Sequence, residues 1–437
     1  MSAENETLLN KRLTRRQLLS MAAVGGSGLA AAALLGCGDD EEGGATPTGT
    51  RPSGVSYPDP GISDTEIKLG SVLPLTGPIL GTNALPNGLR AFMNFVNEEK
   101  GGVNGRRINL TILDGAYVPP QSLDQTRRLV EEQRVFAMVA VLGTPINAAV
   151  LPFMEQRGVP NIGMLTGASI FLNASEHPGT LMGNMPYLAE GGNLGRYIAS
   201  EFPNAKIGVL RQNDSLGQSY LDGLQKALGG RSSQIVSVQT YEVTDTALES
   251  QALNMRNAGA ELVCLFSILR PSIAFIRSAS GVGYQPHYFS GLTAGPTDIV
   301  RSIGPEQFKD RFTALFIQKD PRDPQYQNDP SVLEGRRIVE RYAPGTQLED
   351  PNWIFSLSLG EFLVEALRTM KEPTRKGLVE AGRAIKGFTG MGFLLPGVTW
   401  DSQPRTNATL SKQRLARWDG TRWVQFGGVV DGAQFLT

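Results

Sequence analysis

The residues best suited to chemistry are small polar side chains that follow runs of apolar residues. Thr144 and Asn147 follow one run, and the segment from Thr166 to Ser169 follows the next. Asp245 comes after a later run. These groups offer hydrogen-bond donors and acceptors with few charges, which is typical of a site that holds a small molecule. Each could instead cap the helix that follows it, because Asn, Thr, Ser and Asp are the usual N-cap residues.

The signatures of common enzyme chemistries do not occur in the sequence. The two histidines, His177 and His287, stand in unrelated contexts, and neither has a metal-ligand partner at the usual spacing. There is no Gly-x-Ser-x-Gly elbow and no phosphate-binding Gly-x-x-x-x-Gly-Lys-Ser/Thr loop. We therefore expect a binding protein without a cofactor or a metal. An enzyme that lacks recognisable motifs is the alternative.

The N-terminal sequence has the order of an export signal. Arg15 and Arg16 precede the apolar, small-residue run 18–36. The TRRQLL segment around them resembles a twin-arginine signal. The LLGC motif that ends at Cys37 resembles a lipobox, in which the cysteine is lipidated and anchors the protein to the outer face of the cytoplasmic membrane. A membrane-anchoring helix that is not cleaved is the alternative.

Composition and charge narrow the class further. The chain has 437 residues, 41% apolar and 19% charged, which is the balance of a globular protein of two or three domains. The formal net charge is −1 and no basic stripe occurs, so we expect no nucleic-acid partner. With Cys37 lipidated, only Cys264 remains, which excludes an intramolecular disulfide. Residues 38–65 are rich in Gly, Pro, Thr and acidic residues, which predicts a flexible tether.

The elements that must position the polar residues alternate between strands and helices. Seven apolar segments are predicted to be strands, namely 67–76, 107–115, 135–143, 159–167, 206–214, 234–243 and 261–269. Amphipathic helical patterns of 10–15 residues lie between them, which predicts an α/β fold of doubly wound parallel sheets. The Asp419-Gly420 pair predicts a hairpin near the C-terminus. Pauses near 183–190 and 288–296 predict two α/β units joined by crossing segments.

Ligands of open α/β sheets bind at the carboxyl ends of the strands, beside helix N-termini. Two apolar residues also fall at these ends. Leu80 lies in the turn after the first predicted strand, and Leu216 lies after the fifth. We therefore expect both to line the site with Thr144.

Three long segments resemble a known family. They are IKLGSVLPLTGPILG, the stretch from ILDGAYVPPQ to EQRGVPNIG, and IGVLRQNDSLGQSYLDGLQKAL. In this order they resemble the type I periplasmic substrate-binding proteins of ABC transporters, in the leucine/isoleucine/valine-binding family, from Asp64 onward. The pieces LGTPINAAV with LTGAS, YEVTDTALESQ, DPRDPQYQNDP and LLPGVTW resemble a branch associated with aromatic acids such as benzoates and hydroxycinnamates.

The resemblance implies a fold of two doubly wound parallel-sheet lobes joined by a three-segment hinge, with a cleft that closes on its ligand. After the export signal (1–37) and the tether (38–65), it places lobe I in residues 66–185 plus 291–393. Lobe II would then comprise residues 186–290 plus 394–437.

The resemblance also implies particular site residues. The family's ligand-contacting positions fall here on Asn147, Thr166, Ala168, Ser169, Leu216 and Asp245. Leu216 replaces an aromatic residue of the family. Asp245 is one methylene shorter than the acid that pairs with a ligand ammonium, and it could equally cap a helix beginning near Thr246. We expect a small carboxylate-bearing ligand and rank an aromatic acid above a branched-chain amino acid.

The function implied is that of a monomeric capture protein, which delivers a small organic solute to the permease subunits of an ABC importer. A module that reports ligand occupancy to a signalling partner is the alternative. The sequence shows no membrane-spanning helix after the export signal and no cytoplasmic domain, which disfavours this alternative.

Overall fold

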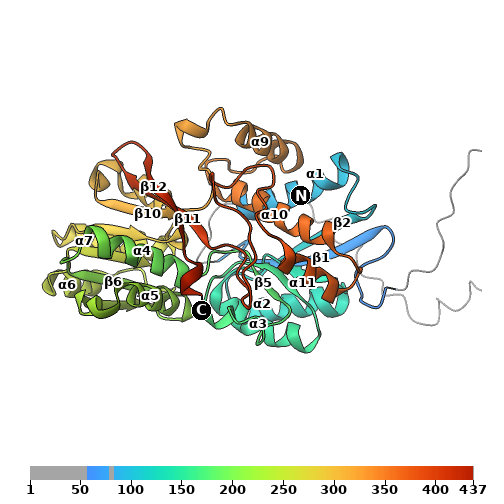
Figure 1. Cartoon of the computed structure of the whole chain (residues 1–437), viewed down its shortest axis with the longest axis horizontal. Helices are drawn as coiled ribbons and strands as arrows, with labels where there is room; N and C mark the ends of the chain where they lie inside the picture. The colour runs from blue at the N-terminus through green and yellow to red at the C-terminus, as the bar shows by residue number, and fades with distance from the viewer. Residues whose placement is uncertain (1–56, 78–82, 437) are drawn as a thin grey trace, which may run out of the picture. The chain divides into compact units, whose positions relative to one another are not determined.

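Two separate sheets organise the chain in this computed structural model, which describes residues 57–77 and 83–436. The first sheet has five strands in the order β2-β1-β3-β4-β5, all parallel. The second has seven in the order β12-β11-β10-β9-β8-β6-β7, of which β11 and β12 run antiparallel to their neighbours. We call the parts built around these sheets lobe I and lobe II (Figure 1). The predicted α/β class is confirmed.

Seven strands lie where their apolar runs predict them, and two more form the C-terminal hairpin, while the strands at 180–182, 287–290 and 312–316 are not among those predicted. Those of lobe I are β1 (Glu66–Leu73), β2 (Arg107–Asp114), β3 (Ala137–Val139), β4 (Asn161–Met164) and β5 (Thr180–Met182). Those of lobe II are β6 (Ile207–Gln212), β7 (Ile235–Tyr241), β8 (Leu262–Phe266), β9 (His287–Ser290), β10 (Phe312–Phe316), β11 (Lys412–Trp418) and β12 (Trp423–Asp431). The seven predicted strands are confirmed. So is the hairpin, in which Trp418 pairs with Trp423.

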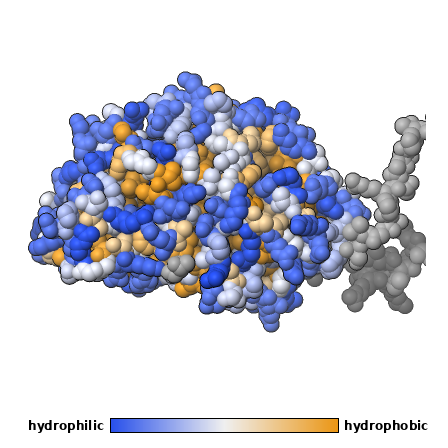
Figure 2. Space-filling view, in the orientation of Figure 1, coloured by the Kyte–Doolittle hydropathy of each residue, from blue (hydrophilic) through white to orange (hydrophobic). Residues whose placement is uncertain are grey.

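Helices cover both sheets. Around lobe I these are α1 (Ala84–Glu99), α2 (Pro119–Arg127), α3 (Thr144–Gln156), α9 (Pro330–Tyr342), α10 (Asn352–Thr369) and α11 (Arg375–Ala384). Around lobe II they are α4 (Tyr187–Glu201), α5 (Ser215–Leu228), α6 (Glu249–Asn257), α7 (Leu269–Gly281) and α8 (Pro296–Ile303). Figure 2 shows a largely hydrophilic face, with hydrophobic side chains gathered near β10 and β11.

Helices α4 and α5 pack with their backbones in close approach. A Cβ atom on Gly223 would lie 2.2 Å from the carbonyl oxygen of Leu188, and one on Gly191 would lie 2.1 Å from that of Tyr220. Only glycine fits at both positions. This packing fixes α4, which directly follows the first crossing between the lobes.

The second crossing differs from the prediction. The segment 291–316 does not return to lobe I, because α8 packs on α7 and β10 joins the lobe II sheet beside β9. The pause near 288–296 is the short 3₁₀ turn Leu292–Ala294 that leads into α8. The chain crosses instead after Phe316, where Gln318 pairs with Leu394 of the third crossing segment.

The third crossing also ends later than predicted. The prediction places residues 394–411 in lobe II, yet they still contact lobe I. The Trp400 ring stacks on Phe362 of α10, and the Thr409 hydroxyl donates to the carbonyl of Met182. Lobe II is rejoined only at β11.

The C-terminal end of the predicted tether is folded. Ile62 is buried and pairs with Ile67, and the guanidinium of Arg106 donates to the carbonyl of Ser63. Residues 57–65 therefore pack on lobe I, because their apolar and carbonyl groups find partners there. The predicted export signal, including Arg15, Arg16 and Cys37, lies outside the described residues. No helix in the described ranges is long and apolar enough to cross a membrane.

Candidate functional site

Two threonine hydroxyls meet where β3 and β4 end. Thr144 opens α3 after β3, and Thr166 follows β4; their Oγ1 atoms lie 2.7 Å apart and both side chains are buried. The Tyr187 side chain, at the start of α4, also interacts with Thr166. Burial raises the pKa of Tyr187, with hydrogen bonds from Thr166, Gly167 and Asn184 acting against it. The phenol stays protonated and can donate a hydrogen bond.

Tyr117 extends this cluster from the end of β2. Ala116 and Tyr117 both have left-handed backbone, with φ of 48° and 58°. The turn is held by Asp114, whose Oδ1 accepts from the backbone N–H groups of Ala116 (2.8 Å) and Leu75 (2.9 Å). It directs the Tyr117 ring onto Gly143, where a Cβ atom would lie 2.4 Å from Cε2 of the ring. Non-glycine residues in this conformation are uncommon and concentrate at functional sites.

Lobe II supplies the facing groups. The side chain of Gln212, at the end of β6, interacts with the Tyr117 phenol. Its Oε1 accepts from the Tyr241 hydroxyl (3.0 Å), and its Nε2 donates to Asp214 Oδ2 (2.7 Å). Burial raises the pKa of Tyr117, so its hydroxyl also stays protonated. Tyr117 and Gln212 therefore lie close to each other at the boundary between the lobes.

A second contact between the lobes lies beside the first. The backbone N–H of Ser169 donates to Oγ of Ser219 on α5 (2.9 Å), and the two hydroxyl oxygens lie 3.0 Å apart. Ser169 thus lies at the boundary of the lobes, and its contact with a ligand stays a prediction. Its partner Ser219 is not among the predicted site residues.

A stack of rings and a buried acid lie behind these contacts. Tyr220 stacks between Tyr187 and Phe266, with centroid distances of 4.7 and 4.9 Å. Glu190 accepts from the backbone N–H of Leu292 (2.9 Å), and burial raises its pKa to about 7 against hydrogen bonds from Leu292, Tyr220 and Gln413. The Glu190 carboxyl group therefore already has hydrogen-bond partners inside lobe II.

The arrangement offers hydroxyl and amide groups with stacked rings. Such groups can bind a carboxylate and an apolar body, while no nucleophile is paired with a base among them. Within residues 57–77 and 83–436, no group of three His, Cys, Asp or Glu side chains could hold a metal ion.

One of the predicted ligand contacts, Asn147, has its partners inside lobe I. Asn147 is fully buried: its Nδ2 donates to the carbonyls of Val141 and Gly143, and its Oδ1 accepts from Asn161. The expected ligand donor is therefore a residue that fixes the turn into α3. Ala168 and Leu216 are also buried, and Leu80 lies outside the described residues.

Asp245 makes a local turn. Its Oδ2 accepts from the backbone N–H of Glu242 (2.8 Å), and its own N–H donates to the carbonyl of Glu242 (2.9 Å). Helix α6 begins only at Glu249, so the alternative that Asp245 caps a helix near Thr246 is wrong.

Tyr117, Gln212 and Tyr187 are not among the predicted site residues. The sequence does contain a signal for Tyr117, because this polar residue follows the end of the second predicted strand, as the predicted site residues follow the ends of others. Gln212 gave no signal, since its position inside a predicted strand did not show which way its side chain points.

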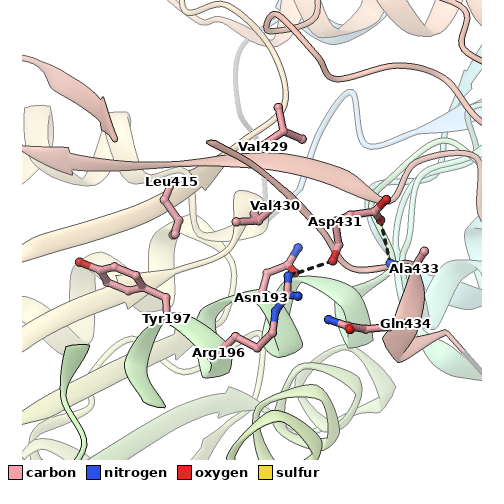
Figure 3. Close-up of a pocket in the computed structure, with 9 residues that line it drawn as sticks. All are labelled: Asn193, Arg196, Tyr197, Leu415, Val429, Val430, Asp431, Ala433 and Gln434. Carbon is pink, nitrogen blue, oxygen red and sulfur yellow. Dashed lines mark hydrogen bonds between the residues drawn. The ribbon is translucent and has the colours of Figure 1, made fainter. Parts of the chain in front are cut away.

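A separate pocket of about 590 Å³ lies on lobe II between α4 and the β11–β12 hairpin (Figure 3). Arg196 reaches across it to donate to Asn193 Oδ1 (2.8 Å) and to the carbonyl of Asp431 (2.9 Å). Its lining includes none of the residues that join the lobes at Tyr117 and Ser169.

Comparisons with known proteins agree with this architecture. A family model described as periplasmic binding protein matches residues 66–422. Leu/Ile/Val-binding protein homolog 7 of Brucella suis biovar 1 is 25% identical over 243 residues, which cover 53% of this chain and 60% of that protein. An amino acid binding protein of Pseudomonas aeruginosa is 23% identical over 248 residues, 56% of this chain and 63% of that one. The matched part thus spans less than two thirds of these relatives.

Solved structures share the fold. A branched chain amino acid ABC transporter protein from Thermus thermophilus with bound valine superposes with a TM-score of 0.73 at 19% identity, covering 86% of this chain and 98% of that one. A solute binding protein of an ABC transporter from R. palustris, in complex with benzoate, gives 0.66 at 16% identity, covering 84% and 98%.

Proposed function

Because the chain belongs to the type I periplasmic binding proteins of the leucine/isoleucine/valine-binding family, we propose that it captures a small carboxylate-bearing solute between its lobes and delivers it to the permease of an ABC importer. Proteins of this family are binding proteins of transport systems and not enzymes. Export, the lipid anchor at Cys37 and a monomeric state are parts of this proposal that rest on the sequence.

The hydrogen bond of Ser169 with Ser219, together with Tyr117 close to Gln212 and the threonine pair, is the observation that carries the proposal. It brings polar groups of both lobes to one place, at the ends of β2, β3, β4 and β6. A ligand that contacts both lobes stabilises their closed arrangement by the difference between its affinities for the closed and open forms. Hydroxyl groups of Thr144, Thr166 and Ser169 are suited to binding a carboxylate.

The chemistry of the cluster favours an aromatic acid over an amino acid. Tyrosine rings can pack on an aromatic body. An amino acid would also need an acid for its ammonium group, and the nearby carboxylates already have partners. Asp214 accepts from Gln212 and from the N–H of Leu216, while Glu190 accepts from Leu292.

A thermal-shift screen of the purified protein tests the proposal. We expect benzoates or hydroxycinnamates to raise the melting temperature more than leucine, isoleucine or valine do, because the tyrosine rings can pack on an aromatic body. A ligand at 100 times its Kd stabilises the folded state by about 2.7 kcal/mol. Titration calorimetry then gives the affinity. The proposal is wrong if no small carboxylate shifts the transition.

Asp245 separates the two ligand classes. For the Asp245→Ala variant we expect the affinity for an aromatic acid to change less than about threefold, because that carboxylate accepts from Glu242 and meets no positive charge in such a ligand. The affinity for an amino acid should fall sharply if Asp245 pairs with its ammonium group. Calorimetry on both ligand classes measures the difference, and equal losses for both would show that the substitution disrupts the loop instead.

A further inference from the structure

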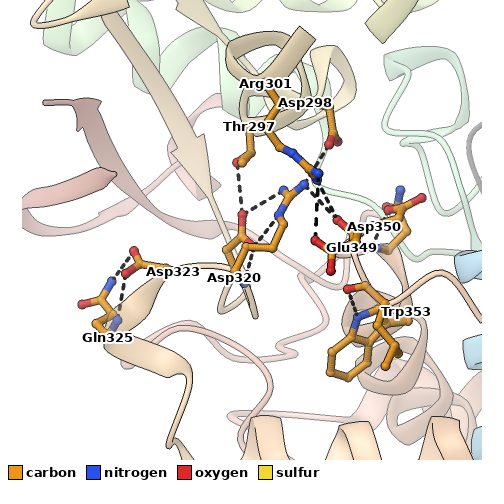
Figure 4. Close-up of polar contacts among 12 residues, drawn as sticks. Thr297, Asp298, Arg301, Asp320, Asp323, Gln325, Glu349, Asp350 and Trp353 are labelled. Atoms are coloured by element: carbon orange, nitrogen blue, oxygen red, sulfur yellow. Dashed lines mark hydrogen bonds and ion pairs between the residues drawn. The ribbon is translucent and has the colours of Figure 1, made fainter. Parts of the chain in front are cut away.

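Arg322, in the second crossing segment, has hydrogen-bond partners in both lobes. Figure 4 shows the polar contacts around Asp298, Asp320 and Glu349. Nη1 of Arg322 donates to Oδ1 of Asp298 on α8 of lobe II (2.8 Å). The same nitrogen donates to the carbonyl of Glu349 (3.1 Å), which lies in the loop before α10 of lobe I. Nε and Nη2 donate to the two carboxylate oxygens of Asp320, each at 2.9 Å, within the crossing segment itself. We call these four residues the hinge clasp.

Neighbouring contacts reinforce both arms of the hinge clasp. On the lobe II side, Oγ1 of Thr297 donates to Oδ2 of Asp320 (3.1 Å). Arg301, also on α8, donates to the carbonyl of Glu349 (3.2 Å). On the lobe I side, the loop is tied to its helix because Nε1 of Trp353 donates to the carbonyl of Leu348 (3.1 Å). The clasp therefore connects parts that are each firmly held in their own lobe.

The hinge clasp is shielded from water. The side chains of Arg322 and Asp320 are each only 14% exposed. Ion pairs at this depth are screened by salt much less than surface pairs are. Burial works against the charged form of Arg322, but the hydrogen bonds and charges of Asp320 and Asp298 outweigh it and raise the pKa of the guanidinium. The guanidinium of Arg322 therefore stays protonated.

The geometry restricts relative motion of the lobes. Hinge motion in two-lobed proteins needs rotation of the backbone in the crossing segments. A guanidinium is planar and its donors have fixed directions, so Arg322 can satisfy Asp298, Asp320 and Glu349 together only in a narrow range of lobe orientations. A rotation that separates α8 from the loop before α10 must break at least one of these bonds.

We propose that Arg322 is a positioning residue that holds the lobes in the orientation described here and so sets the fraction of the protein that is closed. Its effect on ligand affinity rests on the proposed function, while its effect on lobe orientation does not.

Distance measurements on the ligand-free full chain test the hinge clasp. Cysteines replace Leu333 on α9 of lobe I and Val238 on β7 of lobe II, which are 49% and 40% exposed, and both carry spin labels. Cys37 is changed to Ser, and Cys264 is buried and stays unlabelled. We expect Arg322→Gln to broaden the distribution of distances between the labels and to change its mean. An unchanged distribution in a folded variant would overturn the proposal.

The matched control is Arg337→Gln. This guanidinium donates to Glu99 (2.9 Å) and Glu334 (2.7 Å), and all three residues belong to lobe I. It removes an arginine with two carboxylate partners but no contact between lobes, so the distance distribution should match the parent protein. A change as large as that of Arg322→Gln would attribute the effect to lost charge and overturn the proposal.

Asp298→Asn keeps the test decisive if Arg322→Gln fails to fold. This variant weakens only the lobe II arm, so we expect a smaller change in the same direction, and no change in a folded protein would overturn the clasp. For a ligand identified by the thermal-shift screen, Arg322→Gln should lower the affinity about tenfold. If the distances change but no ligand binds, the hinge clasp stands and the proposed function fails.

Discussion

Replacing Gly143 by alanine is expected to remove most of the ligand affinity. Gly143 has φ of +111°, a conformation that favours glycine, and an added Cβ atom would lie 2.4 Å from Cε2 of Tyr117. The ring must move away, and its contact with Gln212 of lobe II is lost with it. Truncation of a buried aromatic anchor typically costs about 2 kcal/mol or more, which is roughly a 30-fold loss of affinity. Calorimetry with the ligand found by the thermal-shift screen measures this loss.

Gly158→Ala is the matched control for this experiment. Gly158 follows the other end of α3 and also has positive φ, +59°, but no atom lies within 4 Å of its added Cβ. It should cost about 1 kcal/mol of stability through backbone strain and leave the affinity unchanged. If Gly143→Ala binds as the parent protein does, Tyr117 does not belong to the site. If both variants lose affinity, the loss reflects general destabilisation.

Glu361→Gln is expected to stabilise the protein at alkaline pH. Glu361 lies on α10, nearly buried, and accepts from the backbone N–H of Met391, while its Oε2 is buried without a hydrogen-bond partner among the described residues. Burial raises its pKa from 4.5 to about 8, against the hydrogen bond from Met391. Glutamine keeps an acceptor for Met391 and carries no charge.

The sign of the effect follows from proton binding. A carboxyl group whose pKa is higher in the folded protein makes its full contribution to the free energy of unfolding below pH 4.5. For Glu361 this contribution is lost as the pH rises to about 8. The Glu361→Gln variant does not lose this contribution. Its free energy of unfolding, relative to that of the parent protein, should therefore increase by up to about 5 kcal/mol between pH 4 and pH 9. Glu190 also has a raised pKa, of about 7, so the free energy of unfolding of the variant should still fall with rising pH, but by less than that of the parent protein.

Chemical denaturation across this pH range measures the difference. The control is Glu380→Gln on α11, where the carboxylate is 65% exposed and no such growth with pH is expected. If the free energies of unfolding of Glu361→Gln and the parent protein differ by the same amount at every pH, Glu361 has no raised pKa in the folded state.

The local features of this fold could be predicted from the sequence. The strands β1, β2 and β6 lie within a few residues of their apolar runs, and the Asp419-Gly420 turn joins β11 to β12 as expected. These features depend on neighbouring residues, because the spacing of apolar residues and the chemistry of turns act over a few positions. The polar residues at strand ends, such as Thr144 and Thr166, could be found for the same reason.

The tertiary structure alone decided which side chains meet. Asn147 and Thr144 lie one turn apart on α3, yet Asn147 points to Asn161 in lobe I while Thr144 meets Thr166. Tyr117 and Gln212 are far apart in the chain and come together only when the lobes dock. The rotation of a helix on its sheet and the docking of two lobes are fixed by packing over the whole molecule.

The boundaries of the lobes were decided in the same way. The return of the chain to lobe I depends on whether β10 pairs with β9, and on the pairing of Gln318 with Leu394. The hinge clasp likewise joins Asp298, Arg322 and Glu349 from three separate segments. Such pairings are set by contacts between distant segments, whose free energy of packing is not determined by the local pattern of either one.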